Sequence, residues 1–97
     1  MPALLNVLVV DDRPDSVRFL LEYLLSLGHR LEKCSGRQGI ATITGARSSG
    51  VPFDLVLMAM DLVGNDGMTL LRDLRNRKDP TAVAIYTPFS EISPAMF

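Results

Sequence analysis

The sequence has 97 residues, of which 47% are apolar and 22% charged, which suits one hydrophobic core in a single domain spanning residues 1–97. Ten basic and eleven acidic side chains give a formal charge of -1, and the arginines are scattered, so nucleic-acid binding by this segment is not expected. The single cysteine rules out an intrachain disulfide. No stretch approaches the roughly 18 apolar residues of a membrane helix, so we expect no membrane partner and a cytoplasmic location.

The first predicted element is a strand over residues 4–10, an apolar run that suits burial on both faces of a parallel sheet. The run ends abruptly at Asp11 and Asp12. Pro14 suits the first turn of a following helix, which faces the sheet and which Gly28 closes. The apolar positions of this helix are Val17, Leu20, Leu21, Leu24 and Leu27.

The second strand and the second helix are weaker in pattern. Residues 29–35 are short and mixed, which predicts an edge strand. The following segment contains glycines and threonines that lower its helix propensity, and a loop at residues 48–50 ends it. The apolar positions of this second helix are Ile40, Ile43 and Ala46.

A second fully buried strand is predicted over residues 53–60, with a loop at residues 61–65. Asp66 or its neighbour is placed to cap a third helix that ends near Asn76. A further apolar strand covers residues 82–87. The predicted apolar face of the third helix consists of Met68, Leu71 and Leu74.

This alternation of strands and helices predicts an α/β fold with a doubly wound parallel sheet and helices on both faces. Ligands of such sheets bind beyond the carboxyl ends of the strands. The residues there are Asp11 with Asp12, the segment 59–61, and Thr87. Carboxylates gathered at one edge are stabilised by a hard cation such as Mg²⁺, and a nearby hydroxyl can contact a phosphoryl oxygen.

Three segments carry a more specific signal: Val-Leu-Val-Val-Asp-Asp at residues 7–12, Asp-Leu-Val-Leu-Met-Ala-Met-Asp at residues 54–61, and Ala-Ile-Tyr-Thr at residues 84–87. With them the chain resembles the receiver domains of two-component response regulators. The resemblance implies a flavodoxin-like receiver fold and a signalling module rather than an enzyme. It also implies Mg²⁺ as cofactor and a histidine kinase or phosphotransfer protein as partner in a phosphorelay.

The resemblance assigns a role to each site residue. Asp11 and Asp12 match the acidic pair that binds Mg²⁺, and Asp61 falls where the family offers a main-chain carbonyl to the metal. Thr87 matches the switch hydroxyl, although it is equally an ordinary β-branched strand residue. Ala59 stands where the family keeps its phosphate-accepting aspartate. A methyl group can neither ligate a cation nor accept a phosphoryl group, so we expect no phosphorylation and weakened or absent Mg²⁺ binding.

Three functions remain open from the sequence. The first is a receiver whose parent form is phosphorylated on an aspartate at position 59, and the second is a pseudo-receiver that acts without phosphate as an interaction module. The third is a Mg²⁺-dependent phosphotransfer enzyme built on Asp11 and Asp12, for which Asp61 is the only candidate nucleophile. The acidic pair is also favourable simply as negative charge at a helix N-terminus.

The resemblance further implies a fifth strand followed by a lysine, and we expect this sequence to end before both. The expected domain is therefore a receiver truncated after the fourth strand, with residues 82–87 as an apolar sheet edge. Such an edge predicts a homodimer, strand exchange or pairing with a partner segment.

Overall fold

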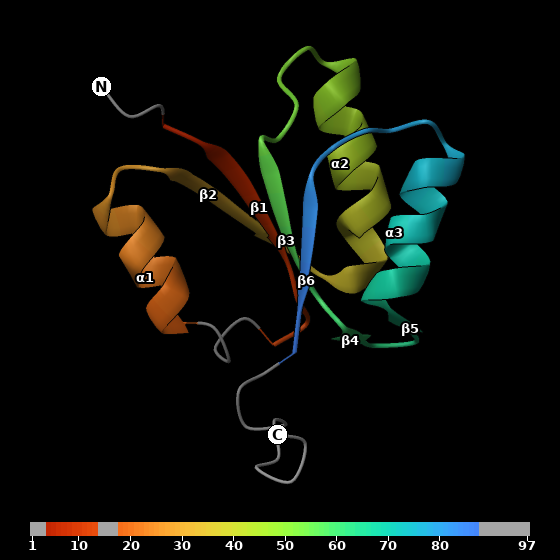
Figure 1. Ribbon diagram of the computed structural model, residues 1–97, viewed down its shortest axis with the longest axis horizontal. Coiled ribbons are helices and arrows are strands. Elements are labelled where there is room, and N and C mark those ends of the chain that lie inside the picture. The colour runs from red at the N-terminus through yellow and green to blue at the C-terminus, as the bar shows by residue number, and fades with distance from the viewer. Residues whose placement is uncertain (1–3, 14–17, 88–97) are drawn as a thin grey trace, which may run out of the picture.

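The chain folds around a parallel sheet, seen here in a computed structural model that describes residues 4–13 and 18–87 (Figure 1). The strands of this sheet lie in the order β2-β1-β3-β6, and every neighbouring pair is parallel. Their bounds are β1 Asn6–Val10, β2 Arg30–Cys34, β3 Leu55–Ala59 and β6 Val83–Tyr86. The predicted doubly wound α/β fold is therefore confirmed, and the second strand lies at one edge as expected.

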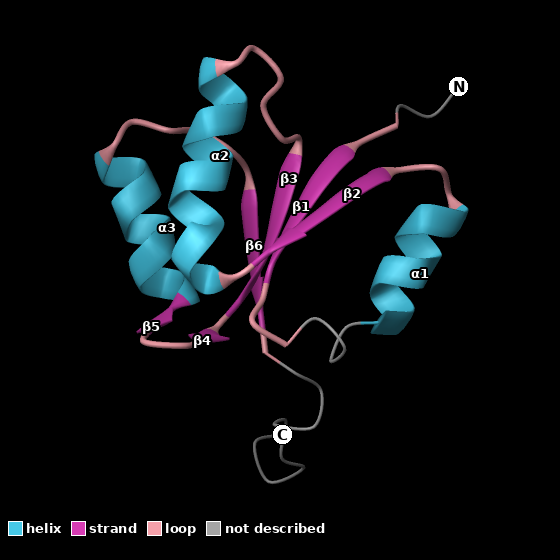
Figure 2. Cartoon of the chain, turned by 180° about the vertical axis from the view of Figure 1, so that it is seen from behind, coloured by secondary structure: helices cyan, strands magenta, loops and turns pink. Residues whose placement is uncertain are grey.

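Helices cover both faces of the sheet. Figures 1 and 2 show α1 (Arg18–Ser26) on one side, with α2 (Gly39–Ser48) and α3 (Gly67–Asn76) together on the other. A short 3-10 helix, η2 (Gly36–Gln38), leads into α2. No helix in the described ranges is long and apolar enough to cross a membrane.

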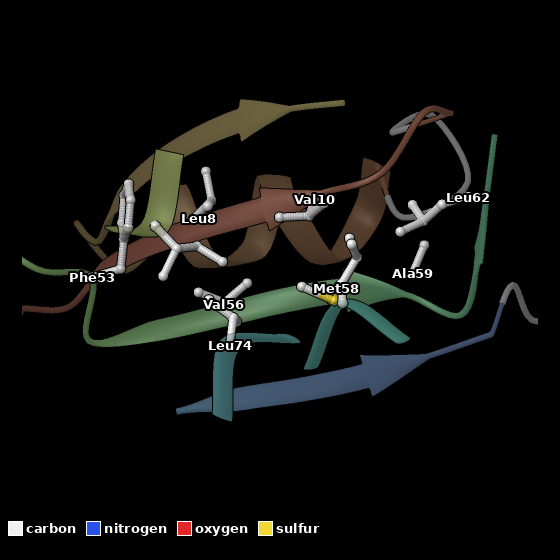
Figure 3. Packing of buried hydrophobic residues seen from close by; sticks show 10 residues of the cluster. Leu8, Val10, Phe53, Val56, Met58, Ala59, Leu62 and Leu74 are labelled. Atoms are coloured by element: carbon white, nitrogen blue, oxygen red, sulfur yellow. The ribbon is translucent and has the colours of Figure 1, made fainter. Parts of the chain in front are cut away.

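The hydrophobic core fills the space between the sheet and the pair α2 and α3 (Figure 3). Its buried members come from β1, β3 and both helices, together with Phe53 before β3 and Leu62 of β4 (Asp61–Leu62). On the opposite face Leu55 and Leu57 of β3 are only half-buried, so the prediction of a fully buried strand is wrong for that face. Ile43 of α2 is fully buried, and Ile40 and Ala46 pack against the cluster, which confirms the predicted face of this helix. The cluster consists of Leu8, Val10, Ile43, Phe53, Val56, Met58, Ala59, Leu62, Leu70 and Leu74.

The buried face of α3 differs from the predicted one. Leu74 is buried as expected, but Met68 is 45% exposed, and Gly67 and Leu70 face the sheet instead. The reason lies at Gly67, where a Cβ atom would come within 2.5 Å of the Ala59 carbonyl oxygen. Only glycine allows this close approach, so the buried face of α3 begins at Gly67. Hydrophobic spacing cannot reveal this, because glycine has no apolar side chain.

The predicted inner face of α1 is also only partly buried. Leu21 is buried and Leu24 is half-buried, whereas Leu20 and Leu27 are exposed. Pro14 and Val17 lie outside the described residues. On its face of the sheet α1 packs mainly against β2, so only a narrow stripe of the helix is buried.

A buried carboxylate holds the connection between α3 and β6. Asp79 accepts hydrogen bonds from the Thr81 amide and hydroxyl at 2.9 and 2.6 Å, and Arg47 of α2 lies 3.3 Å away. Burial alone raises the pKa of Asp79, but these hydrogen bonds and the arginine charge outweigh it, so the pKa lies below its usual value. This network ties α2 to the start of β6 and thereby positions the strand.

The face of α3 can be tested by comparing two truncations in one helix. Leu74→Ala should lower the free energy of unfolding by about 2 to 5 kcal/mol, because the side chain is fully buried in the core. Met68→Ala should change it by less than about 1 kcal/mol, because Met68 is 45% exposed and lies outside the core cluster. Urea denaturation followed by circular dichroism measures both. Equal losses in the two variants would contradict this orientation of α3.

Candidate functional site

The site lies at the carboxyl ends of β1, β3 and β6, where the strands reach the same edge of the sheet (Figure 1). Asp11 and Asp12 follow β1, and Ala59 is the last residue of β3. Tyr86 is the last residue of β6 and lies opposite Ala59 in the strand register. The sheet thus brings the acidic pair and the segment that begins at Ala59 to one edge, as predicted for a parallel sheet.

Asp11 joins the end of β1 to the end of β6. Its carboxylate is 7% exposed, and its Oδ2 accepts a hydrogen bond from the Tyr86 hydroxyl at 2.5 Å. Its Oδ1 accepts the Arg13 amide at 2.8 Å, and its own amide donates to the Cys34 carbonyl. Burial, followed by the hydrogen bond to Asp11, raises the pKa of Tyr86 well above its usual value. The phenol therefore remains a neutral donor to Asp11 throughout the physiological range.

Asp12 joins β1 to two loops. Its Oδ1 accepts the amide of Gly36, the first residue of η2, at 3.1 Å. Its Oδ2 accepts the Val63 amide at 2.7 Å. Val63 lies in the turn between β4 (Asp61–Leu62) and β5 (Asn65–Asp66), a short antiparallel hairpin where a plain loop was predicted. Each oxygen of both aspartates thus accepts a hydrogen bond from this chain.

Ala59 places a methyl group at the end of β3. The residue is 2% exposed and belongs to the hydrophobic cluster, in which Figure 3 shows it near Leu62. The next residue continues the sheet, because the Met60 amide donates to the Tyr86 carbonyl at 2.7 Å. The Met60 carbonyl then accepts the amide of Gly67, at the start of α3, at 2.8 Å. Position 59 is therefore firmly held but supplies no polar side-chain atom.

The remaining predicted residues lie at the rim of the site. Asp61 is exposed in β4, and Thr87 is exposed just beyond β6. Asp66 caps α3 as predicted, because its side chain accepts the Thr69 amide at 2.7 Å. The hydrogen bonds from Thr69 lower the pKa of Asp66.

The arrangement does not fit a tightly held metal ion. No three His, Cys, Asp or Glu residues in the described part of the chain are grouped to hold one. Asp11 and Asp12 provide only two carboxylates, and Ala59 provides no third. Because all the carboxylate oxygens already accept hydrogen bonds, a cation would have to share or displace these donors.

Sequence reasoning missed Tyr86 as a site residue. Tyr86 is part of the Ala-Ile-Tyr-Thr segment, but the resemblance assigns a site role only to Thr87. The signal available was its position at the end of a strand, which places it at the ligand-binding edge of a parallel sheet. Its hydrogen bond to Asp11 spans 75 residues, and no local pattern indicates a partner that distant.

Comparisons with known proteins agree on one family. Residues 7–96 match the family described as "Response regulator receiver domain". The transcriptional regulatory protein AruR of Pseudomonas aeruginosa is 38% identical over 82 residues, which are 82% of this chain and 33% of that protein. BaeR of Escherichia coli, also a transcriptional regulatory protein, is 30% identical over 87 residues, which are 90% of this chain and 35% of that protein. The chain thus spans about a third of the length of these curated relatives.

A solved structure shares the fold. It is an aspartate-to-alanine variant of the response regulator MaeR bound to sulfate, and its TM-score is 0.64. The sequences are 27% identical, and the match covers 96% of this chain and 72% of that one.

The contribution of Tyr86 to the site can be measured with a pair of conservative variants. Tyr86→Phe should lower the free energy of unfolding by about 1 to 3 kcal/mol, because it removes a hydrogen bond to a buried carboxylate. Tyr23→Phe is the control: this tyrosine is 61% exposed on α1, and the expected change is below about 0.5 kcal/mol. Urea titration gives both values. An unchanged stability of Tyr86→Phe would mean that the hydrogen bond to Asp11 has no structural importance.

Proposed function

The chain belongs to the family of response regulator receiver domains of two-component systems. We propose that it is a receiver module in which Ala59 prevents phosphorylation. The observation that carries the proposal is the buried methyl group at the end of β3, 2% exposed, beside the acidic pair. A methyl group offers no oxygen to attack a phosphoryl group. A histidine kinase or phosphotransfer protein is the partner that the family implies.

The parent form of this site carries an aspartate at position 59. In that form a third carboxylate joins Asp11 and Asp12, and Mg²⁺ offsets the mutual repulsion of the three. We assign Asp11, Asp12 and the main chain of Asp61 as the metal-binding groups of the parent. Thr87 is assigned as the hydroxyl that contacts the phosphoryl group, because it follows β6 at the same edge of the sheet.

The similar solved structure supports an alanine at such a site. That response regulator carries an aspartate-to-alanine substitution and was solved as a folded protein with sulfate bound. The observation concerns that protein. It supports the proposal that a response regulator with alanine in place of an aspartate can fold. A parent with an aspartate at position 59 follows by analogy.

A second candidate function is a pseudo-receiver that binds partners without phosphate. The hydrogen bonds of the acidic pair favour it, because Asp11 and Asp12 accept donors from β6, η2 and the β4-β5 hairpin and so hold these elements to the end of β1. In this function the carboxylates stabilise a fixed surface. No observation on the described residues specifically favours the phosphotransfer enzyme, and its candidate nucleophile Asp61 is exposed in β4.

The edge formed by β6 suits association with another strand. In the described sheet β6 pairs only with β3, and it consists of Val83, Ala84, Ile85 and Tyr86. Its apolar composition makes an open edge unfavourable in water. We therefore assign residues 82–87 as a surface for dimerisation, strand exchange or a partner segment.

Hydrogen exchange tests this assignment. The amides of Val83 and Ile85 should exchange slowly when the protein is concentrated or a partner is added. Fast exchange of both amides under all conditions contradicts the assignment.

The test of the receiver function is a titration with beryllofluoride, a mimic of the phosphoryl group, in the presence of Mg²⁺. Amide chemical shifts near Asp12, Asp61 and Thr87 should not respond in this chain, because position 59 has no carboxylate. They should respond in Ala59→Asp. The matched control is Ala41→Asp, which adds the same carboxylate to an exposed position of α2 and should give no response.

The outcomes separate the two candidate functions. A response in Ala59→Asp alone supports the silenced receiver. If Ala59→Asp also fails to respond while remaining folded by circular dichroism, the chain acts as a phosphate-independent interaction module.

A further inference from the structure

The opposite edge of the sheet, formed by β2, carries a charge pattern that is complementary to itself. We propose that two copies of this chain associate through β2, with their strands antiparallel about a two-fold axis at Leu31. This interface lies at the far side of the sheet from β6. It does not depend on phosphorylation or on the identity of residue 59.

The backbone of β2 determines which groups are open to a second strand. The Arg30 amide donates to the Leu5 carbonyl at 2.9 Å, and the Cys34 carbonyl accepts the Asp11 amide at 3.1 Å, so both residues bond toward β1. Amide groups of successive strand residues point to opposite sides. Arg30, Glu32 and Cys34 therefore face β1, and Leu31 and Lys33 present their N–H and C=O groups to the open side.

These open groups favour one antiparallel register. When Leu31 lies opposite Leu31 of the second copy, the two residues form a hydrogen-bonded pair and exchange two N–H···O=C bonds. Arg30 of each copy then lies opposite Glu32 of the other. Cross-strand pairs of opposite charge stabilise a sheet, and a two-fold axis produces this pair twice.

The neighbouring registers are disfavoured by the same side chains. An axis at Glu32 places the two glutamates opposite each other, and an axis at Lys33 does the same for two lysines. Like charges directly opposite are destabilising. Charged residues on an edge strand also discourage pairing with unrelated strands. The charges of Arg30, Glu32 and Lys33 thus discourage pairing of β2 with unrelated strands. They permit pairing with a second copy in the Leu31-centred register.

The surroundings of β2 provide room for a second strand. A groove of about 650 Å³ runs beside this edge, between residues of α1 and α2. Two of its apolar side chains are largely exposed, Leu25 at 55% and Val51 at 62%. Coverage by a second copy removes this apolar surface from water. The groove is lined by Leu25, Leu31, Thr42, Ala46, Val51 and Phe53, among others.

The test uses charge reversal in the full chain. Sedimentation equilibrium over about 10 µM to 1 mM should show a reversible dimer. Glu32→Arg and Arg30→Glu, each alone, create like-charged pairs and should raise the dimer Kd at least about tenfold. The double variant Arg30→Glu/Glu32→Arg restores opposite charges and should recover the original Kd. An equimolar mixture of the two single variants should form a heterodimer, because each then meets its complement.

The matched control is Glu22→Arg, the same charge reversal on the exposed face of α1. It should leave the Kd unchanged. Circular dichroism of every variant establishes that the fold is retained.

Amide exchange locates the interface independently. The Leu31 and Lys33 amides should exchange slowly at high protein concentration and rapidly in dilute solution. Exchange should be slow at both concentrations for the amides bonded to β1, which are those of Arg30, Glu32 and Cys34. A monomer across the whole range with rapid exchange at Leu31 overturns the proposal. A dimer whose Kd is unaffected by Glu32→Arg, with protection at Val83 and Ile85 instead, also overturns it and assigns the contact to β6.

Discussion

The structure depends on the hydrogen bonds that the two aspartates after β1 accept. Asp11 binds the Tyr86 hydroxyl at the end of β6, and Asp12 binds the amides of Gly36 and Val63. The end of β6 and two loop segments are thereby held at one edge of the sheet. A carboxylate is well suited to this role, because it has two oxygens and accepts strong charge-assisted hydrogen bonds. The arrangement of the candidate site follows from these contacts.

The methyl group of Ala59 leaves this edge of the sheet without a third carboxylate beside Asp11 and Asp12. A third carboxylate there would repel Asp11 and Asp12 and favour a bound cation. With a methyl group in its place, the protein's own donors satisfy the acidic pair, and the hydrophobic cluster extends to the end of β3. A receiver fold is compatible with this state, since the close approach of Gly67 to the Ala59 carbonyl involves main-chain atoms of position 59. The side chain at position 59 can therefore change the chemistry of the site while the main-chain contact with Gly67 is kept.

Local pattern was sufficient for much of the fold. The strands β1 and β3 are evident as continuous apolar runs, although Leu55 and Leu57 of β3 are only half-buried. The cap of α3 is predicted at Asp66 or its neighbour, because capping involves residues within one turn. Patterns were insufficient where a face depended on a contact with another element. Met68 is predicted in the core, but Gly67 is the residue of that turn that approaches the sheet. Leu20 and Leu27 are predicted to face the sheet, but α1 packs mainly against β2 and leaves them exposed.

The sequence alone determined the alternation of strands and helices, the acidic pair after the first strand and the alanine at the end of the third. These features depend on residue type and on spacing within short segments. Only the tertiary structure decided what the carboxylates contact. Their partners Gly36, Val63 and Tyr86 lie 24, 51 and 75 residues away along the chain, and two of the three donate main-chain amides that every residue except proline carries. Folding of the sheet is what brings these distant donors to the aspartates.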